Sequence, residues 1–292
     1  MRLLREGPAS RSSLAEKLHL DRSTLTHLAN DLLAAGLVVE DSHGEASSRG
    51  GRRPRLLRLN PGRYFALGCH VQAHTTEWVL VSLDGRVCAG GEIARPPGHD
   101  DADEWMAAAV RRVGSAIEDA TAGARTQILY AGISVPGLID VKSGVLLESI
   151  ELDARTLNVA SHWRALARDI YVDNDARCSA WQLAGSAPGQ RIAILVQVKL
   201  HQNRDGFFRS SGAGIGLAYL LEGKFFNGSH RAAGELRGVD WTTDAPDQLG
   251  VRLDSIEQEH GRTEALRRLV HELLRNLSVV ISAFDPDVVV IA

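Results

Sequence analysis

The sequence is poor in cysteine and in long apolar runs, and each shortage excludes a class of protein. Its three cysteines among 292 residues are Cys69, Cys88 and Cys178. They are odd in number and form no Cys-x-x-Cys pair, which excludes a disulfide framework and a cysteine metal knuckle. No stretch approaches about 18 uncharged apolar residues, so no membrane span is predicted. The first 20 residues are charged and lack an apolar h-region, so no secretory signal is predicted and we expect a cytoplasmic protein.

The formal net charge of -3 conceals an asymmetry between the two ends of the chain. Residues 1–65 carry 11 Lys/Arg against 7 Asp/Glu, whereas the remainder carries 22 against 29. A basic N-terminal part on an acidic body suggests that only the former meets a polyanion. The length suits about two domains, and a hydrophobic content of 44% gives ample core material.

Two short helices are predicted at the N-terminus. Residues 10–20 form the first, with Ser10 as its N-cap and with Ser13 and Glu16 spaced as in a capping box. The second runs from an Asp21 N-cap to residue 35, where a glycine follows as a left-handed terminator. Its polar leading residues, which in a helix-turn-helix enter the major groove, are Arg22, Ser23, Thr24, Thr26 and His27.

A β-hairpin is predicted after the helix pair, with strands over 37–40 and 55–59. Such a hairpin is the wing of a winged helix-turn-helix. Near its tip, Arg49, Arg52 and Arg53 stand among glycines and a proline, and extended arginines suit a narrow minor groove. The alternatives are a flexible basic linker and an ordinary helical hairpin. Only six residues precede Gly7, so a helix ahead of the pair is very short or the chain begins late.

The body shows one α/β unit twice. Three strands are predicted within 64–94, then a helix over 101–122 and a buried strand over 128–135. This is the opening of a ribonuclease-H-like, actin-like ATPase half. The pattern returns with strands over 191–200 and 215–221, a helix over 263–284 and a strand over 287–292. The cleft between two such units is a natural ligand site.

Three motifs in the body are specific: the glycine-rich stretch 211–236, Ser-Val-Pro-Gly-Leu-Ile-Asp over 134–140, and Val-Asp-Asn-Asp-Ala over 172–176. With them the chain resembles the repressor branch of the ROK family from about Leu4 onward. The resemblance implies an α/β protein with a winged helix-turn-helix over 1–60. It also implies a two-lobed sugar-kinase fold over 61–292, with a lobe boundary near 135–175. The last strand stops where the family continues, so we expect a truncated, incomplete second lobe.

The resemblance also implies a sugar site. In kinases of the family the aspartate matching Asp175 is the general base, and residues matching Asn174 and Glu235 bond the sugar ring. A carboxylate and an amide suit sugar hydroxyls, which both donate and accept. Glycines 212, 214 and 216 let a backbone approach a ligand or a neighbouring strand closely. The alternatives are a loop cap for Asp175 and a solvated turn residue for Glu235.

Departures from the family carry equal weight. Where kinases have an Asp-x-Gly-Gly-Thr phosphate loop, residues 68–75 read GCHVQAHT, so kinase chemistry is not expected. Gly238 stands where the family has a zinc-ligand histidine, and residues 239–262 contain no cysteine, so no metal and no cofactor are expected. Glu151 loosely aligns with a sugar-binding asparagine. Residues 201–210 look like an insertion.

These observations predict a transcriptional regulator rather than an enzyme. It would be a repressor whose body senses a sugar or sugar derivative and whose N-terminal domain binds a double-stranded operator as a homodimer. Two alternatives stay open. One is a sugar kinase that carries an additional N-terminal domain, and the other is a DNA-binding protein whose body only dimerises.

Overall fold

The computed structural model describes residue 4 and residues 6–43, 54–96, 101–121, 126–186, 191–202, 206–230, 232–242, 245 and 247–292. They form two compact units. Unit 1 comprises Met1–Val135, Val141–Leu146 and Ile150–Val172. Unit 2 comprises Pro136–Asp140, Leu147–Ser149 and Asp173–Ala292.

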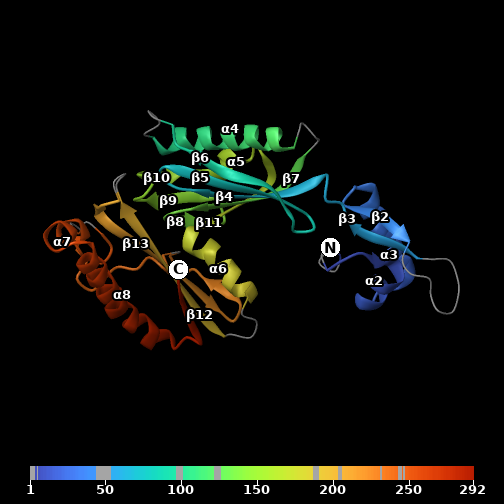
Figure 1. The fold of residues 1–292 in the computed structure, drawn as a ribbon. Coiled ribbons are helices and arrows are strands. Elements are labelled where there is room, and N and C mark those ends of the chain that lie inside the picture. Colours follow the sequence, from blue (N-terminus) through green and yellow to red (C-terminus); the bar gives the residue numbers. More distant parts are fainter. Residues whose placement is uncertain are drawn as a thin grey trace. The chain divides into compact units, whose positions relative to one another are not determined.

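The N-terminal part of unit 1 contains two helices and a small sheet (Figure 1). The helices are α2 (Arg11–Lys17) and α3 (Arg22–Ala34). The antiparallel sheet has the order β1-β3-β2, with bounds Ala9–Ser10, Arg55–Leu59 and Val38–His43. Ser10 and Asp21 accept backbone N–H bonds as N-caps, and Gly36 has a φ of 71°. The two predicted caps and the left-handed glycine are confirmed, whereas β1 was not predicted.

A small core holds this N-terminal part together and continues into the first strand of the body. Leu14, Leu25, Val38 and Leu57 are buried in it together with Tyr64. The Tyr64 hydroxyl donates to the carbonyl of the residue after α3, with an O···O distance of 2.6 Å. The end of α3 is therefore tied directly to the strand that begins at Tyr64.

The main sheet of unit 1 has the order β11-β7-β4-β5-β6. The bounds are Tyr64–Val71 for β4, Thr75–Ser82 for β5, Val87–Ala94 for β6, Gln127–Val135 for β7 and Ala167–Asn174 for β11. Strands β4, β5 and β6 are antiparallel, and β7 lies parallel to β4. Helix α4 (Ala102–Ala120) covers the sheet (Figure 1) and buries Trp105 and Met106 completely. This is the predicted ribonuclease-H-like opening.

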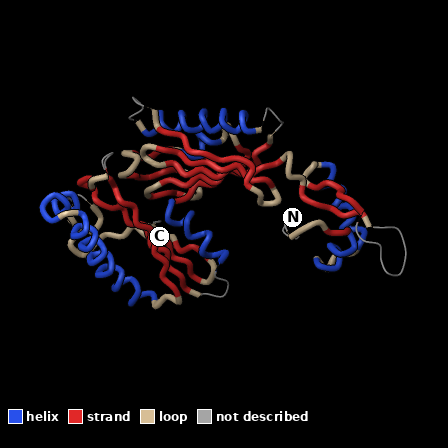
Figure 2. Tube along the Cα trace, in the orientation of Figure 1, coloured by secondary structure: helices blue, strands red, loops and turns tan. Residues whose placement is uncertain are grey.

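The sheet of unit 2 repeats this order as β15-β12-β13-β14. Its strands are β12 (Ile192–Gln202), β13 (Phe208–Leu221), β14 (Lys224–Phe226) and β15 (Val288–Ile291). Again the first three are antiparallel, and the strand that follows the helices is parallel to the first. Helix α8 (Arg262–Phe284) lies along this sheet as a separate layer (Figure 2), with Leu269, Leu273 and Leu277 in the shared core. The predicted duplication of one α/β unit is confirmed.

Shorter elements complete the fold. Strands β8 (Leu138–Asp140), β9 (Val145–Ser149) and β10 (Ala154–Leu157) form a third body sheet, and the remaining helices are α5 (Val159–Trp163), α6 (Asp175–Ser186) and α7 (Leu253–His260). Within the described residues, no helix combines the length and apolar character that a membrane crossing requires. The end of β11 and the start of α6 place the residues of the candidate site.

Candidate functional site

Asn174 joins two of the motifs that the sequence singled out. Its side-chain carbonyl accepts the backbone N–H of Ala176 at 2.9 Å and so caps α6. Its amide nitrogen donates to the carbonyl of Gly137 at 3.0 Å. Gly137 has a φ of 113°, and a Cβ there would overlap the carbonyl oxygen of Glu148. Both polar atoms of the Asn174 side chain are therefore bonded to the backbone of the protein itself.

A buried ion pair lies beneath this turn. The guanidinium of Arg177 donates to Asp173 at 2.6 Å, and their side chains are 5% and 4% exposed. The same Asp173 oxygen accepts the backbone N–H of Asn174 at 2.8 Å. A buried charge pair that also satisfies the backbone holds a turn in one conformation.

Asp175 is buried at the start of α6, and both of its carboxylate oxygens are engaged. Oδ1 accepts the backbone N–H of Ala176 at 2.9 Å. Oδ2 lies 2.6 Å from Nζ of Lys199, which comes from β12. The aspartate that the resemblance assigns to proton abstraction is thus held in an ion pair with this chain's own lysine.

Glu235 lies near Asp175. It forms an isolated bridge to Gly216 of β13, next to a bond from the Leu217 N–H to the Gly234 carbonyl of 2.9 Å. Glu235 is exposed as a whole residue, but the surrounding protein partly desolvates its carboxyl and so raises the pKa, which the negative charge of Asp175 raises further. Unit 2 therefore brings together the three predicted ligand residues, Asn174, Asp175 and Glu235. Their role toward a ligand stays a prediction.

The three signature glycines make room for other parts of the protein. A Cβ at Gly212 would meet Oδ2 of Asp247 at 2.8 Å, and one at Gly214 would meet the imidazole of His201 at 3.2 Å. At Gly216 the nearest atom would be Cβ of Ala176 at 2.8 Å. The predicted close backbone approach is present, and these neighbours are protein atoms.

The 68–75 loop in unit 1 uses its backbone groups internally. The Gln72 N–H donates to the Thr75 carbonyl at 2.8 Å, and the Ala73 N–H points at Oε1 of Glu151 at 3.4 Å. The Gln72 carbonyl accepts from the Trp105 indole at 3.0 Å. Backbone amides that would cradle a phosphate in a kinase are here directed at groups of the chain itself.

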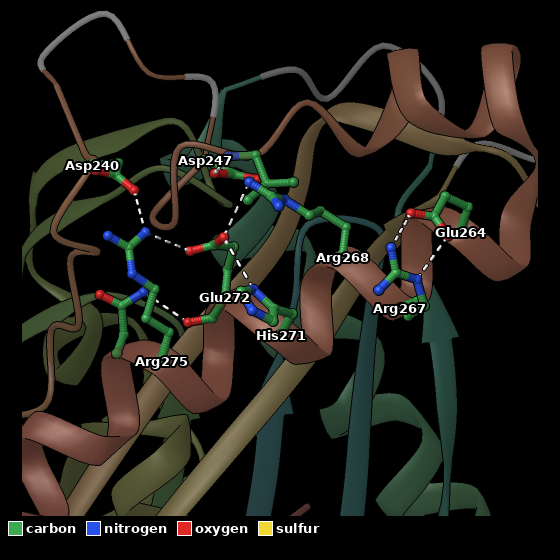
Figure 3. A network of polar contacts seen from close by, with 10 residues as sticks. Asp240, Asp247, Glu264, Arg267, Arg268, His271, Glu272 and Arg275 are labelled. Atoms are coloured by element: carbon green, nitrogen blue, oxygen red, sulfur yellow. Dashed lines mark hydrogen bonds and ion pairs between the residues drawn. The ribbon is translucent and has the colours of Figure 1, made fainter.

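A polar network on α8 is centred on the carboxylate of Glu272 (Figure 3), whose side chain is only 4% exposed. Three basic side chains contact it at 3.2–3.3 Å: Arg268, His271 and Arg275. Arg275 also donates to Asp240 at 2.6 Å. Arg275 of α8 thus links the Glu272 carboxylate to Asp240, which lies in the segment that follows Glu235.

The same segment is anchored at two further points. The Val239 N–H donates to the side-chain carbonyl of Asn276 at 2.9 Å, and the Gly238 N–H donates to the Gln248 carbonyl at 2.7 Å. A Cβ at Gly238 would meet the amide nitrogen of Asn276 at 3.4 Å. Polar side chains of α8 therefore hold the segment in which relatives were expected to have a zinc ligand. The described residues contain no group of three His, Cys, Asp or Glu side chains able to hold a metal ion.

The predicted DNA-contacting residues of α3 are all exposed: Arg22, Ser23, Thr24, Thr26 and His27. The hydroxyls of Ser23 and Thr24 both donate to Asp21 at 2.6 Å. These bonds hold the pKa of the Asp21 carboxyl well below its usual range. Ser23 and Thr24 thus act in helix capping, and their part in DNA binding stays a prediction. Arg49, Arg52 and Arg53 lie outside the described residues.

The sequence did not predict that Lys199 lies beside Asp175. Lys199 is 24 positions from Asp175, and only the pairing of β12 with β13 beside α6 brings it there. No local signal in the sequence marks Lys199, which precedes the predicted insertion over 201–210. Part of that insertion is a structured continuation of the β12–β13 hairpin, with Gln202 paired to Phe208.

Comparison with protein families places residues 67–238 in the ROK family model. The Xylose repressor of Caldicellulosiruptor bescii is 25% identical over 228 residues, covering 78% of this chain and 53% of that protein. The DNA-binding transcriptional dual regulator NagC of Escherichia coli strain K12 is 23% identical over 232 residues, covering 79% and 53%. The chain thus spans about half the length of these curated relatives.

Solved structures share the fold. A ROK family transcriptional regulator, homologous to the Escherichia coli MLC protein, matches 97% of this chain and 78% of its own with a TM-score of 0.66 and 19% identity. A ROK family glucokinase from Streptomyces griseus, solved with glucose and AMPPNP, matches 78% and 82% with a TM-score of 0.55 and 16% identity. Regulators and kinases are both among the structural relatives, so the chemistry of this chain depends on its own residues.

Proposed function

The chain belongs to the ROK family, and from this membership we propose that it is a DNA-binding transcriptional regulator, a repressor that responds to a sugar or sugar derivative. The observation that carries the proposal is the exposed, polar N-terminal half of α3 ahead of a ROK body. The regulators among its relatives support the same assignment.

The N-terminal domain over 1–60 would act as a winged helix-turn-helix. Arg22, Thr26 and His27 would face the major groove, while the arginines of the wing would reach the minor groove. A homodimer would read two half-sites one helical turn apart, because two-fold proteins match palindromic operators.

The body would bind the effector at Asn174, Asp175 and Glu235. A ligand changes operator affinity only by the difference in its affinity for two conformations of the protein. If the sugar binds more tightly to a conformation in which the two N-terminal domains of the dimer are wrongly spaced, the protein would release the operator.

We also propose that the body has no kinase activity. Transfer of a phosphoryl group needs backbone amides and a metal to hold phosphates, and a base that accepts the hydroxyl proton. The Gln72 and Ala73 amides and the Asp175 carboxylate are directed at other groups of the chain.

The test is a binding assay with a labelled duplex from the gene's own upstream region, with and without a panel of aldopentoses and aldohexoses. We expect binding that weakens as salt increases and that at least one sugar reverses. A parallel assay for sugar-dependent ATP turnover should be negative for the wild type and for Asp175→Asn alike. ATP turnover that disappears in Asp175→Asn, with no DNA binding, would establish the kinase alternative.

A further inference from the structure

Lys199 lies on the polar face of the β12–β13 hairpin. Gln197 and Lys199 stand opposite Gly216 and Gly214 in the antiparallel register. Directly opposed residues share one face of a sheet, so these two side chains project on the side of the two glycines. Cβ of Ala176, at the start of α6, lies on that side as well. The lysine therefore reaches Asp175 across space that the glycines leave open.

The hairpin that carries Lys199 is fixed to its own unit beyond this point. Phe208 is buried in the core of unit 2, and its N–H donates to Oε2 of the buried Glu257 at 2.7 Å. The guanidinium of Arg262 donates to the Gly206 carbonyl at 2.6 Å and lies over the Phe208 ring. Lys199 is thus held on a strand that is anchored on both sides of the bulge between Leu200 and Gln202.

Both oxygens of Asp175 already have partners, Ala176 N–H at Oδ1 and the Lys199 ammonium at Oδ2. The side chains of Asp175 and Lys199 are 10% and 23% exposed, so water screens this pair only weakly. A sugar hydroxyl that donates to Oδ2 of Asp175 must share that oxygen with the ammonium or displace it. An uncharged sugar brings no charge to compensate the ammonium for that loss.

We propose that Lys199 is a specificity-determining residue of the sugar site, because it competes with the hydroxyls of uncharged sugars for the Asp175 carboxylate. The role of Lys199 rests on the proposed function, which assigns Asp175 to sugar binding. Lys199 lowers the affinity for those uncharged sugars whose hydroxyl must take Oδ2 of Asp175, and so selects against them as effectors.

Titration calorimetry with D-xylose, D-glucose and N-acetyl-D-glucosamine tests this directly. Lys199→Met removes the ammonium and keeps the apolar stem, and Lys224→Met on β14 is the matched control. We expect Lys199→Met to bind at least one of the three sugars tenfold or more tightly than the wild type, and Lys224→Met to bind as the wild type does. Asp175→Asn combined with Lys199→Met should lose the gain.

Equal or weaker sugar binding by Lys199→Met would overturn the proposal, as would binding by none of the variants. If Lys199→Met does not fold by circular dichroism, Lys199→Gln replaces it with the same expected gain. DNA binding by the wild type is measured separately. Its absence would remove the proposed regulator function, while a tenfold gain in sugar affinity would still support the role of Lys199.

Discussion

At Gly137 the backbone has a φ of 113°, and a side chain there would overlap the Glu148 carbonyl. We expect Gly137→Ala to cost about 3 kcal/mol of unfolding free energy, from the strained φ and from the contact. Gly132→Ala is the control, because a Cβ at Gly132 meets nothing within 4 Å. Urea denaturation of both variants measures the difference. Equal midpoints would show that the turn holding Asn174 is not rigid.

Glu235 should give the stability a pH dependence. Partial desolvation of its carboxyl and the charge of Asp175 raise its pKa above the ordinary value of 4.5, so the native protein retains that proton more strongly than the unfolded chain. The native state then loses stability as the pH rises from about 4.5 through the raised pKa. Glu235→Gln should therefore stabilise the protein at pH 7 relative to the wild type and change little at pH 4. Urea denaturation at the two pH values checks this, and an equal effect at both would contradict it.

Among the elements, α8 offers a comparison of a buried and a partly exposed carboxylate (Figure 3). Glu272 is 4% exposed and contacts three basic groups, while Glu264 is 39% exposed and pairs with Arg267 at 2.6 Å. We expect Glu272→Gln to lower the unfolding free energy by about 1–3 kcal/mol, since basic groups around it lose their partner. Glu264→Gln should cost less than about 1 kcal/mol. If the two costs measured by urea denaturation are equal, the network does not anchor the segment after Glu235.

Elements with strong periodicity could be predicted from the sequence. Helix α8 is found over Arg262–Phe284 against a predicted 263–284, and α4 over Ala102–Ala120 against 101–122, because apolar residues at helical spacing define both. The two-residue strand β1 was missed, since nothing local distinguishes it from a loop. Helix α6 was not predicted, because its start at Asp175 coincides with a motif that was interpreted as part of a sugar site.

The site could be predicted only in part. Asn174, Asp175 and Glu235 lie in contiguous motifs, which allowed them to be proposed together, and their role toward a ligand stays a prediction. Lys199 was not predicted, because an ion pair between residues 24 positions apart depends on strand register and on where α6 packs. The polar network on α8 was not predicted from the sequence for the same reason, since Arg275 and Asp240 are 35 residues apart.

On the scale of the whole molecule, we expect the N-terminal domain and the body to have separate roles. In the proposed function the N-terminal domain would bind DNA, and the body would change that affinity without transferring a phosphoryl group. The repeated sheet order β7-β4-β5-β6 and β15-β12-β13-β14 gives the body the architecture shared by the kinases. The groups that kinase chemistry needs, in the loop after β4 and at Asp175, are engaged with the chain itself.

The most direct measurement is the affinity for the upstream duplex, by fluorescence anisotropy at 0.1 and 0.2 M salt, after Ala replaces His27, Arg52 and Arg53 together. A matched control replaces Arg267 of α8, which is 68% exposed. Loss of the Arg52 and Arg53 charges from the minor groove, together with His27 from the major groove, should weaken binding at least tenfold and reduce the salt dependence, while the control binds as the wild type does. Unchanged affinity of the triple variant at both salt concentrations would contradict the assignment of DNA binding to the N-terminal domain.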